Sequence, residues 1–251
     1  MKLQGKVAVV TGAGSGMGKA IATLYAQEGA KVVAADMNQA ALDAVVAEIK
    51  AAGGEATAIV VNVSKNEEVV NMVDTAVKTY GSIDVLVNNA GIMDNFMPVA
   101  DVKDDLWDRV LGVNLNGVFY GSRAALKYMV EQDSGVIINN ASVGGLFGAR
   151  GGAAYIASKH GVIGLTKNIA STYGREGKIR ANAIAPGGVN TNISSTITEP
   201  SALGFAAIRD TGPSRMADPM EIARVALFLA SDDASFVNGV TVPVDGGWTA
   251  R

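Results

Sequence analysis

The sequence predicts an α/β protein: a doubly wound parallel sheet with helices on both faces. Short apolar runs alternate with longer segments of helical periodicity, and this alternation is typical of βαβ units. The runs are apolar along most of their length, as expected for strands that are buried on both faces. Of the 251 residues, 49% are hydrophobic and 18% are charged, which excludes a disordered chain.

The elements follow from these periodicities in chain order. The expected strands cover residues 7–10, 31–35, 56–61, 85–87, 136–139, 180–184 and 240–244. The expected helices cover residues 19–29, 39–52, 65–80, 108–131, 154–173 and 219–231.

The domain organisation is simple because the chain contains no Pro/Ser-rich linker, repeat or low-complexity segment. We expect one domain over residues 1–251. The long irregular stretch from Gly187 to about Pro219 is expected to hold a substrate loop at about 188–218, because structureless loops of that length are usually functional. A plain surface excursion is the alternative.

Composition restricts the possible partners. The net charge of −3 provides no basic field for nucleic acid or anionic lipid. No segment has the apolar length of a membrane span or the form of a signal peptide, so we expect a cytoplasmic protein without membrane partners. The absence of cysteine excludes disulfides and thiolate metal sites. With His160 as the single histidine, we expect no metal site, and we interpret His160 as structural.

A glycine-rich turn follows the first expected strand. Residues 11–18 read TGAGSGMG, and a helix is expected directly after them. Glycine permits the sharp turn, the close approach of a pyrophosphate and the packing of helix on strand. The free N–H groups at the start of the helix favour phosphate. We therefore expect a dinucleotide site that includes Gly12, Ser15, Gly16, Met17 and Gly18.

Asp36 ends the second expected strand, about twenty residues beyond the glycine loop. An acid at this point accepts hydrogen bonds from the adenosine ribose hydroxyls and would repel a 2′-phosphate. We expect Asp36 and the adjacent Met37 to contact the cofactor. Neither Ser15 nor Met37 is basic, so the sequence favours NAD over NADP. Considered alone, an acid at this position is more often a helix N-cap or a solvated turn residue.

Tyr155 and Lys159 stand four residues apart at the start of an expected helix, on one helical face. A neighbouring ammonium and the positive nicotinamide of NAD⁺ would lower the pKa of the tyrosine, which would allow it to act as an acid/base. Ser142, just beyond an expected strand, could hydrogen-bond a substrate carbonyl. Each feature alone is common. A tyrosine and a lysine four residues apart are often an ordinary pair on a helix surface, and a single serine after a strand is often a turn residue.

Taken together, the motifs resemble the short-chain dehydrogenase/reductase family over essentially the whole chain. The matching pieces are Thr11-Gly12-x-x-x-Gly16-x-Gly18, Asn88-Asn89-Ala90-Gly91, Asn114, Ser142, Tyr155-x-x-x-Lys159 and Pro186-Gly187. The resemblance implies a Rossmann-type sheet of seven parallel strands and a homotetramer that uses the helices over 108–131 and 154–173 at one interface.

The resemblance also implies the site. A catalytic tetrad of Asn114, Ser142, Tyr155 and Lys159 is expected, in which Asn114 holds a relay water and Lys159 binds the nicotinamide ribose. The remaining expected cofactor-binding residues are Asn62, Val63, Asn89, Ala90 and Gly91 on the adenosine side and Pro186, Gly187, Val189 and Thr191 near the nicotinamide.

Two positions depart from the family pattern. Asn62 stands where the family often has an aspartate that meets the adenine amino group, and its amide oxygen could accept the same hydrogen bond. Met17 replaces a more usual branched aliphatic residue in the glycine loop, where its thioether can fill the same space.

These features predict an oxidoreductase that transfers a hydride between NAD(H) and a secondary alcohol or ketone. The substrate pocket is expected from residues 93–99, 143–150 and 190–215, whose apolar content favours an uncharged ketone, although Arg150 and Arg209 keep an acidic substrate open. Alternatives are a 3-oxoacyl-carrier-protein reductase, a glucose-type sugar dehydrogenase or a non-catalytic dinucleotide sensor. The tetrad argues against the sensor.

Overall fold

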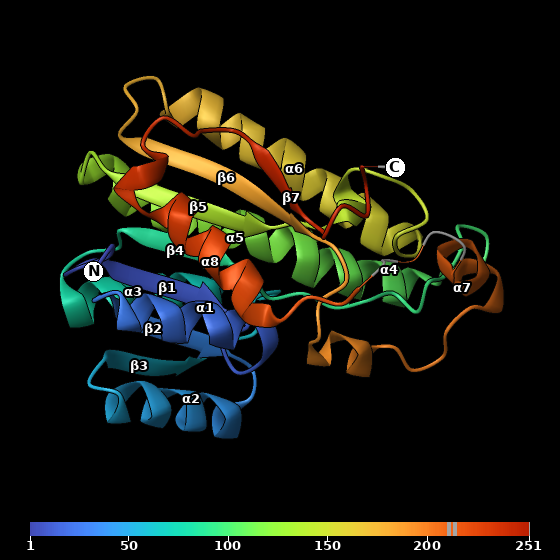
Figure 1. The fold of residues 1–251 in the computed structure, drawn as a ribbon, viewed down its shortest axis with the longest axis horizontal. Helices are drawn as coiled ribbons and strands as arrows, with labels where there is room; N and C mark the ends of the chain where they lie inside the picture. Colours follow the sequence, from blue (N-terminus) through green and yellow to red (C-terminus); the bar gives the residue numbers. More distant parts are fainter. Residues whose placement is uncertain (210–211, 213–214, 251) are drawn as a thin grey trace.

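In a computed structural model, the described residues (1–209, 212 and 215–250) form one parallel sheet of seven strands in the order β3-β2-β1-β4-β5-β6-β7 (Figure 1). The strands are β1 (Val7–Thr11), β2 (Lys31–Asp36), β3 (Glu55–Val60), β4 (Val85–Asn88), β5 (Gly135–Asn140), β6 (Ile179–Pro186) and β7 (Thr241–Val244). Each expected strand is present, and the Rossmann-type sheet is confirmed.

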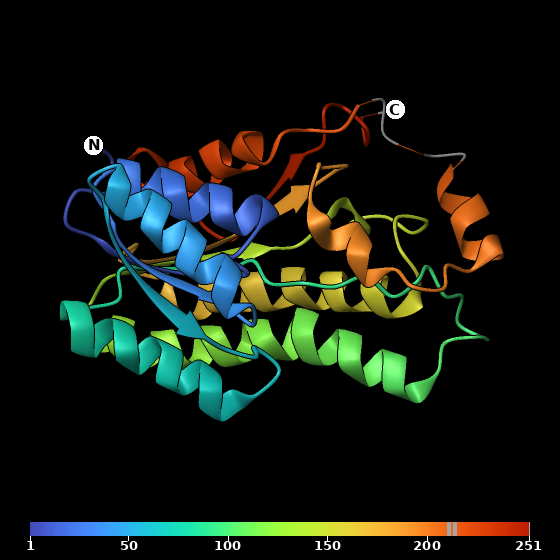
Figure 2. The same cartoon turned by 90° about the horizontal axis from the view of Figure 1, so that it is seen from below.

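The helices are α1 (Gly16–Gln27), α2 (Gln39–Ala51), α3 (Asn66–Tyr80), α4 (Asp104–Leu111), α5 (Gly117–Glu131), α6 (Ala153–Tyr173), α7 (Ala202–Arg209) and α8 (Pro219–Ala230). Figure 2 shows α1, α2 and α8 on one face of the sheet and α3, α5 and α6 on the other. Strand β1 shows why both faces are buried: Ala8 and Val10 join one hydrophobic cluster, whereas Val7 and Val9 join the other.

The structure corrects two helix expectations. The helix expected over 108–131 begins at Asp104 and passes through a π-helical turn, η1 (Gly112–Asn116), before α5. The stretch expected to be irregular contains helix α7 and a 3₁₀ turn, η3 (Asn192–Thr196). The small residues of α7 obscured its apolar spacing. Residues 210, 211, 213 and 214 of the expected substrate loop and residue 251 lie outside the described residues.

The topology determines where a ligand can bind. The chain runs from β1 to β2 and β3 on one side, then crosses to β4 on the other side of β1. In open α/β sheets of this kind, the crevice at the carboxyl ends of the strands beside this switch point is the usual ligand site. The glycine loop, Asp36 and residues 89–92 all lie at this edge.

Candidate active site

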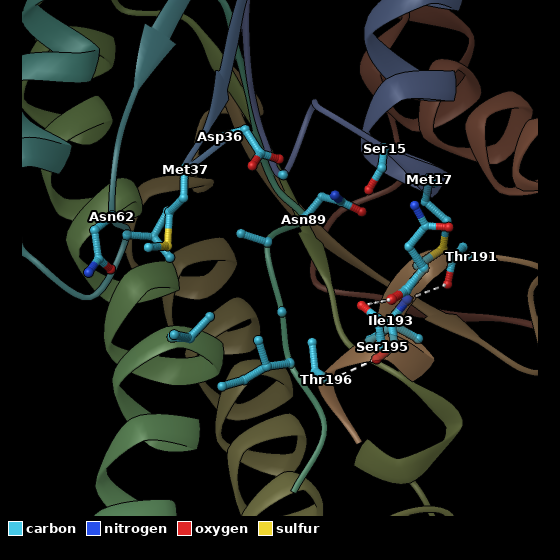
Figure 3. Close-up of a pocket in the computed structure, with 18 of the residues that line it drawn as sticks. Ser15, Met17, Asp36, Met37, Asn62, Asn89, Thr191, Ile193, Ser195 and Thr196 are labelled. Atoms are coloured by element: carbon cyan, nitrogen blue, oxygen red, sulfur yellow. Dashed lines mark hydrogen bonds between the residues drawn. The ribbon is translucent and has the colours of Figure 1, made fainter. Parts of the chain in front are cut away.

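A groove runs along the carboxyl edge of the sheet across the switch point. Figure 3 shows Asp36, Met37 and Asn62 toward one end and Met17, Thr191 and Ile193 toward the other. Twelve expected cofactor residues line it: Gly12, Ser15, Gly16, Met17, Asp36, Met37, Asn62, Val63, Asn89, Ala90, Gly91 and Thr191. Three further lining residues, Val61, Ile92 and Val113, were not expected from the sequence. The groove is also lined by Asn192, Ile193, Ser195 and Thr196, which belong to the segment over 190–215 that was expected to form the substrate pocket.

The glycine loop is built for close approach. A Cβ on Gly18 would lie 2.0 Å from the carbonyl oxygen of Gly12, so Gly18 packs the start of α1 against the turn rather than lining the groove. Ser15 precedes α1, but its side chain makes no capping hydrogen bond, and no acid lies in the first turn. The uncapped end of α1 therefore faces the groove with the charge character that phosphate requires.

Asp36 lies toward the end of the groove away from Thr191. Its Oδ2 accepts a hydrogen bond from the backbone N–H of Gly14 at 3.0 Å, and its Oδ1 accepts one from Asn38 at 3.0 Å. Each carboxylate oxygen keeps a further lone pair for a ribose hydroxyl. Met37 beside it is 65% exposed and offers a 2′-phosphate no charge. Asn38, rather than Asp36, caps α2 through its side chain.

The expectation for Asn62 is wrong in its chemistry, although the residue does line the groove. Its Oδ1 accepts hydrogen bonds from the backbone N–H of Ser64 at 3.0 Å and from the Ser64 hydroxyl at 2.7 Å. Two donors occupy both lone pairs of that oxygen. The side chain is therefore left with its Nδ2 donor, which cannot accept a bond from an adenine amino group.

A buried polar network fixes the loops around the switch point, and sequence reasoning missed most of it. The Thr11 hydroxyl accepts bonds from the backbone N–H groups of Asn89 and Ala90, while Asn89 Nδ2 donates to the Thr11 carbonyl at 2.9 Å. Asn140 Nδ2 donates to Asn89 Oδ1 at 2.9 Å, whereas Asn140 Oδ1 is buried with no partner in the structure. This unsatisfied acceptor, beside the glycine loop and Lys159, fits a site that receives a hydroxyl-bearing ligand.

The structure brings Tyr155, Lys159 and Ser142 together at the start of α6. Lys159 is 3% exposed, and its Nζ lies 5.7 Å from the centre of the Tyr155 ring. Nζ donates to the Asn140 carbonyl at 2.8 Å. Ser142 accepts a hydrogen bond from the backbone N–H of Gly144 at 3.0 Å, so it also caps η2 (Val143–Gly145). Its side chain also hydrogen-bonds Tyr155.

The electrostatics of this cluster are dominated by burial. Burial raises the pKa of Tyr155 above its usual 10, hydrogen bonding to Ser142 opposes this, and the charge of Asp94 adds to it. Burial also lowers the pKa of Lys159 to about 8. Burial is therefore the larger influence on the Tyr155 pKa in the chain alone, and the lowering expected with NAD⁺ bound stays a prediction.

Asn114 lies within the π-helical turn and is completely buried. Its Oδ1 accepts from the backbone N–H of Ile92 and its Nδ2 donates to the Ile92 carbonyl, both at 2.9 Å. Nδ2 also lies 3.3 Å from the Ser158 hydroxyl. The side chain therefore clamps the backbone beyond Gly91, and π-turns of this kind are frequent at functional sites.

Strand β6 leads into a long loop whose first and last residues are paired with each other. Gly187 bonds the Val244 carbonyl, and Val189 pairs with Ala217 in an isolated bridge. Asn190 N–H donates to the Ala217 carbonyl at 2.9 Å, which closes the neck of the loop that was expected to bind substrate. Pro186, Gly187 and Val189 do not line the groove themselves; they position Thr191, which does.

Other expected features are placed as follows. His160 is exposed on α6 and bonds the Ile156 carbonyl through Nδ1 at 3.0 Å, consistent with a structural role. Trp248 is buried beneath Arg150, whose guanidinium lies 4.6 Å from the indole ring. Among residues 1–209, 212 and 215–250, no group of three His, Asp or Glu side chains could hold a metal, and no helix could cross a membrane.

Comparisons with known proteins agree with this geometry. A family model described as Enoyl-(Acyl carrier protein) reductase matches residues 12–249. The chain is 48% identical over 251 residues to 3beta-hydroxysteroid dehydrogenase 2 of Eggerthella lenta, covering 99% of this chain and 96% of the relative. The chain belongs to the short-chain dehydrogenase/reductase family. It is therefore an oxidoreductase that interconverts alcohols and ketones with a nicotinamide dinucleotide.

Two further relatives show the range of this family. The 3-oxoacyl-[acyl-carrier-protein] reductase of Thermotoga maritima is 43% identical over 248 residues, with 98% of this chain and 99% of the relative covered. Cyclohexanol dehydrogenase of Acinetobacter sp. is 40% identical over 250 residues, with 100% and 97% covered. A solved structure of a putative NAD(P)-dependent gluconate 5-dehydrogenase from Beutenbergia cavernae, with NADP bound at low occupancy, superposes with a TM-score of 0.89 at 40% identity over 100% of this chain and 99% of that one.

Proposed function

We propose that this protein is an NAD-dependent dehydrogenase/reductase for apolar secondary alcohols and ketones, with Tyr155 as its general acid/base. The observation that carries the proposal is the groove itself. The acidic residue Asp36 lies at its adenosine end, and the buried Tyr155–Lys159–Ser142 cluster lies at the carboxyl ends of β5 and β6. The glycine cradle and the unpartnered Asn140 oxygen support a dinucleotide between them.

The catalytic roles follow from the state of each group. When bound, the nicotinamide supplies or accepts the hydride at the substrate carbon. In reduction, the neutral Tyr155 hydroxyl donates its proton to the carbonyl oxygen, and the Ser142 hydroxyl stabilises the charge developing there. In oxidation, Tyr155 takes the alcohol proton. Lys159 holds the ribose and, when protonated, favours the phenolate.

The role of Asn114 in proton relay is also a proposal. Its side chain is fully engaged with Ile92 and Ser158. A relay water at Asn114 would therefore bind its backbone carbonyl rather than its amide group. On this interpretation, the π-helical turn provides both the clamp on Ile92 and the path from Lys159 to solvent.

The test follows the absorbance of reduced nicotinamide, with NADH and NADPH run in parallel against cyclohexanone and a 3-ketosteroid. We expect NADH to be consumed with at least tenfold higher kcat/KM than NADPH. Tyr155→Phe should bind NADH normally but lose at least a thousandfold in kcat, because it removes the only transferable proton of that ring. Wild-type turnover by Tyr155→Phe would exclude the mechanism, and a preference for NADPH would exclude the role given to Asp36.

A carrier-linked 3-oxoacyl substrate is the second candidate, because the Thermotoga maritima relative is an acyl-carrier-protein reductase. A short 3-oxoacyl thioester assayed beside cyclohexanone distinguishes the two. Higher kcat/KM for the thioester, with NADPH preferred, would favour this candidate. A sugar dehydrogenase, favoured by the gluconate 5-dehydrogenase likeness, is tested by adding gluconate and glucose to the same panel.

We further propose that the whole chain, residues 1–251, acts as one domain and that it assembles as a cytoplasmic homotetramer. Its exposed face over α5 and α6 holds a groove lined by Phe119, Arg123, Val130, Leu165 and Tyr173. Phe119, Val130 and Tyr173 are each more than 40% exposed in the single chain. This exposed apolar surface supports the assembly, because a second copy would bury it.

A further inference from the structure

The loop of residues 93–97, between β4 and α4, holds two different parts of the active site. Asn95 and Phe96 adopt φ values of +57° and +56°, a left-handed conformation that non-glycine residues rarely adopt, and here they adopt it in succession. Such strain persists only where the surroundings impose it, and it is concentrated at functional sites. The contacts on either side of these residues show what imposes it.

Asp94 binds the beginning of the catalytic helix. Its side chain is completely buried, although it lies outside the tetrad. Oδ1 accepts from the backbone N–H of Gly152 at 2.9 Å, and Oδ2 accepts from the backbone N–H of Tyr155 at 2.8 Å. The Met97 carbonyl accepts from Ala153 N–H at 2.9 Å. Three N–H groups at the start of α6 are therefore satisfied by this one loop.

Helix α6 has no cap of its own. Gly152 stands at the N-cap position without a side chain, and no acid lies in the first turn. A Cβ on Gly152 would lie 2.5 Å from an oxygen of Asp94, so the approach of the carboxylate depends on glycine at this position. A carboxylate at a helix N-terminus satisfies free N–H groups and interacts favourably with the helix dipole. Asp94 thus acts as a remote cap, 61 residues before Tyr155 in sequence.

Asn95 binds the substrate loop on the opposite side. Its Oδ1 accepts from Thr198 N–H at 2.8 Å, and its carbonyl accepts from Ser201 N–H at 2.9 Å. The rings of Phe96 and Phe205 lie 5.8 Å apart. The left-handed turn at Asn95 and Phe96 therefore lets consecutive residues bind the catalytic helix and the substrate loop.

We propose that Asp94 is a positioning residue that fixes Tyr155 through the first turn of α6, and that Asn95 is the residue that docks the substrate loop. The inference rests on the proposed role of Tyr155. It assigns the positioning of the catalytic tyrosine to Asp94 and the docking of the substrate loop to Asn95. Loss of Asp94 impairs the chemical step. Loss of the Asn95 side chain impairs the binding of substrate.

The experiment compares Asp94→Ala with Asn95→Gly, which removes the side chain but keeps the left-handed turn accessible. Cyclohexanone and the 3-ketosteroid are reduced with NADH under saturating cofactor. We expect Asp94→Ala to lose at least tenfold in kcat with KM within threefold of wild type. We expect Asn95→Gly to raise KM at least fivefold with kcat within threefold. Asp94→Asn, which keeps one of the two acceptor oxygens, should recover about half of the loss, and Asn95→Asp, which keeps the acceptor for Thr198, should recover most of it.

Hydrogen–deuterium exchange provides a readout that does not depend on turnover. In Asp94→Ala, amides over residues 152–156 should exchange at least tenfold faster, while those over 197–204 keep their wild-type rate. Asn95→Gly should show the reverse pattern. Unchanged exchange over 152–156 in both Asp94 variants, or a fall in kcat shared equally by the Asp94 and Asn95 variants, would overturn the proposal. If Asp94→Ala does not fold, Asp94→Asn carries the same comparison at about half the effect.

The result that would refute the proposed function differs from the result that would refute the role of Asp94. Full activity of Tyr155→Phe would remove Tyr155 as the acid/base without altering the exchange pattern. Wild-type exchange together with an inactive Tyr155→Phe would instead leave the catalytic role in place and exclude the positioning role of Asp94.

Discussion

The buried ammonium of Lys159 is the side chain at which stability and catalysis conflict most directly. It is fully enclosed, it donates to the Asn140 carbonyl, and burial lowers its pKa to about 8. In the unfolded chain its pKa is about 10.4. Below about pH 8 the group is charged in both states, so the folded state bears the full cost of burying the charge. This cost is relieved as the pH rises from about 8 to about 10.4, where the unfolded state binds the proton more tightly.

We therefore expect Lys159→Met to abolish turnover yet raise the free energy of unfolding at pH 7 by about 1 to 3 kcal/mol. The gain should shrink toward pH 10.5, because the wild type then buries a neutral amine. Urea unfolding at the two pH values measures this. Lys167→Met, an exposed lysine on the same helix, serves as a control and should change stability by less than about 0.5 kcal/mol. A destabilised Lys159→Met at pH 7 would contradict the expectation.

Asn62 leads to a prediction about cofactor recognition. Since Ser64 occupies its oxygen, Asn62 presents a donor toward the groove. Nicotinamide hypoxanthine dinucleotide carries a carbonyl where NAD carries the adenine amino group, so wild type should bind it at least as tightly as NAD. Asn62→Asp restores an acceptor and should shift the ratio of Kd values toward NAD about fivefold, on the order of 1 kcal/mol.

A fluorescence titration of the two reduced dinucleotides measures both Kd values for each variant. An unchanged ratio in Asn62→Asp would show that Asn62 does not contact the base. Activity is not needed for this test, so it remains decisive for a variant that turns over slowly.

Among the elements, the turn between β1 and α1 has the tightest steric constraint. Gly18 has no room for a methyl group against the Gly12 carbonyl, and neither residue can shift without separating the helix from the strand. Ser15, three residues earlier, makes no capping hydrogen bond. Within one turn of helix, Gly18 therefore tolerates no larger side chain, whereas the Ser15 side chain makes no capping hydrogen bond that a substitution would remove.

Gly18→Ala is expected to lower the free energy of unfolding by about 2 to 4 kcal/mol, as overpacking of a fixed backbone does. Ser15→Ala is the matched change and should leave stability within about 0.5 kcal/mol. Thermal unfolding of the two proteins without cofactor makes the comparison. Equal melting temperatures would show that the helix can move away from Gly12.

At the scale of the whole molecule, the α5/α6 face determines the expected assembly. Phe119→Glu combined with Val130→Glu places charges on this face, and burial of unpaired charge opposes association. Sedimentation velocity at micromolar concentration should show a tetramer for wild type and a smaller species for this variant. Val99→Glu, at another strongly exposed apolar position, should sediment as wild type does. A monomeric wild type would remove the assembly.

The sheet, its strands and most of the groove residues could be predicted from the order of amino acids. Apolar runs separated by amphipathic segments have few other ways to bury their surfaces, and a glycine turn followed by an acid is a local signal. The Tyr155–Lys159 pair was likewise readable, because the two residues lie one helical turn apart, whereas the full tetrad rested on the family resemblance.

How these groups are held, and how their pKa values are shifted, depends on the folded chain. The cap on α6 comes from Asp94, the acceptor of Asn62 is taken by Ser64, and the Tyr155 pKa is raised by burial. Neither a cap supplied from a distant segment nor the pKa of an enclosed phenol depends on nearby sequence. Both depend on which groups the folded chain brings within hydrogen-bonding distance and on how completely it excludes water from them.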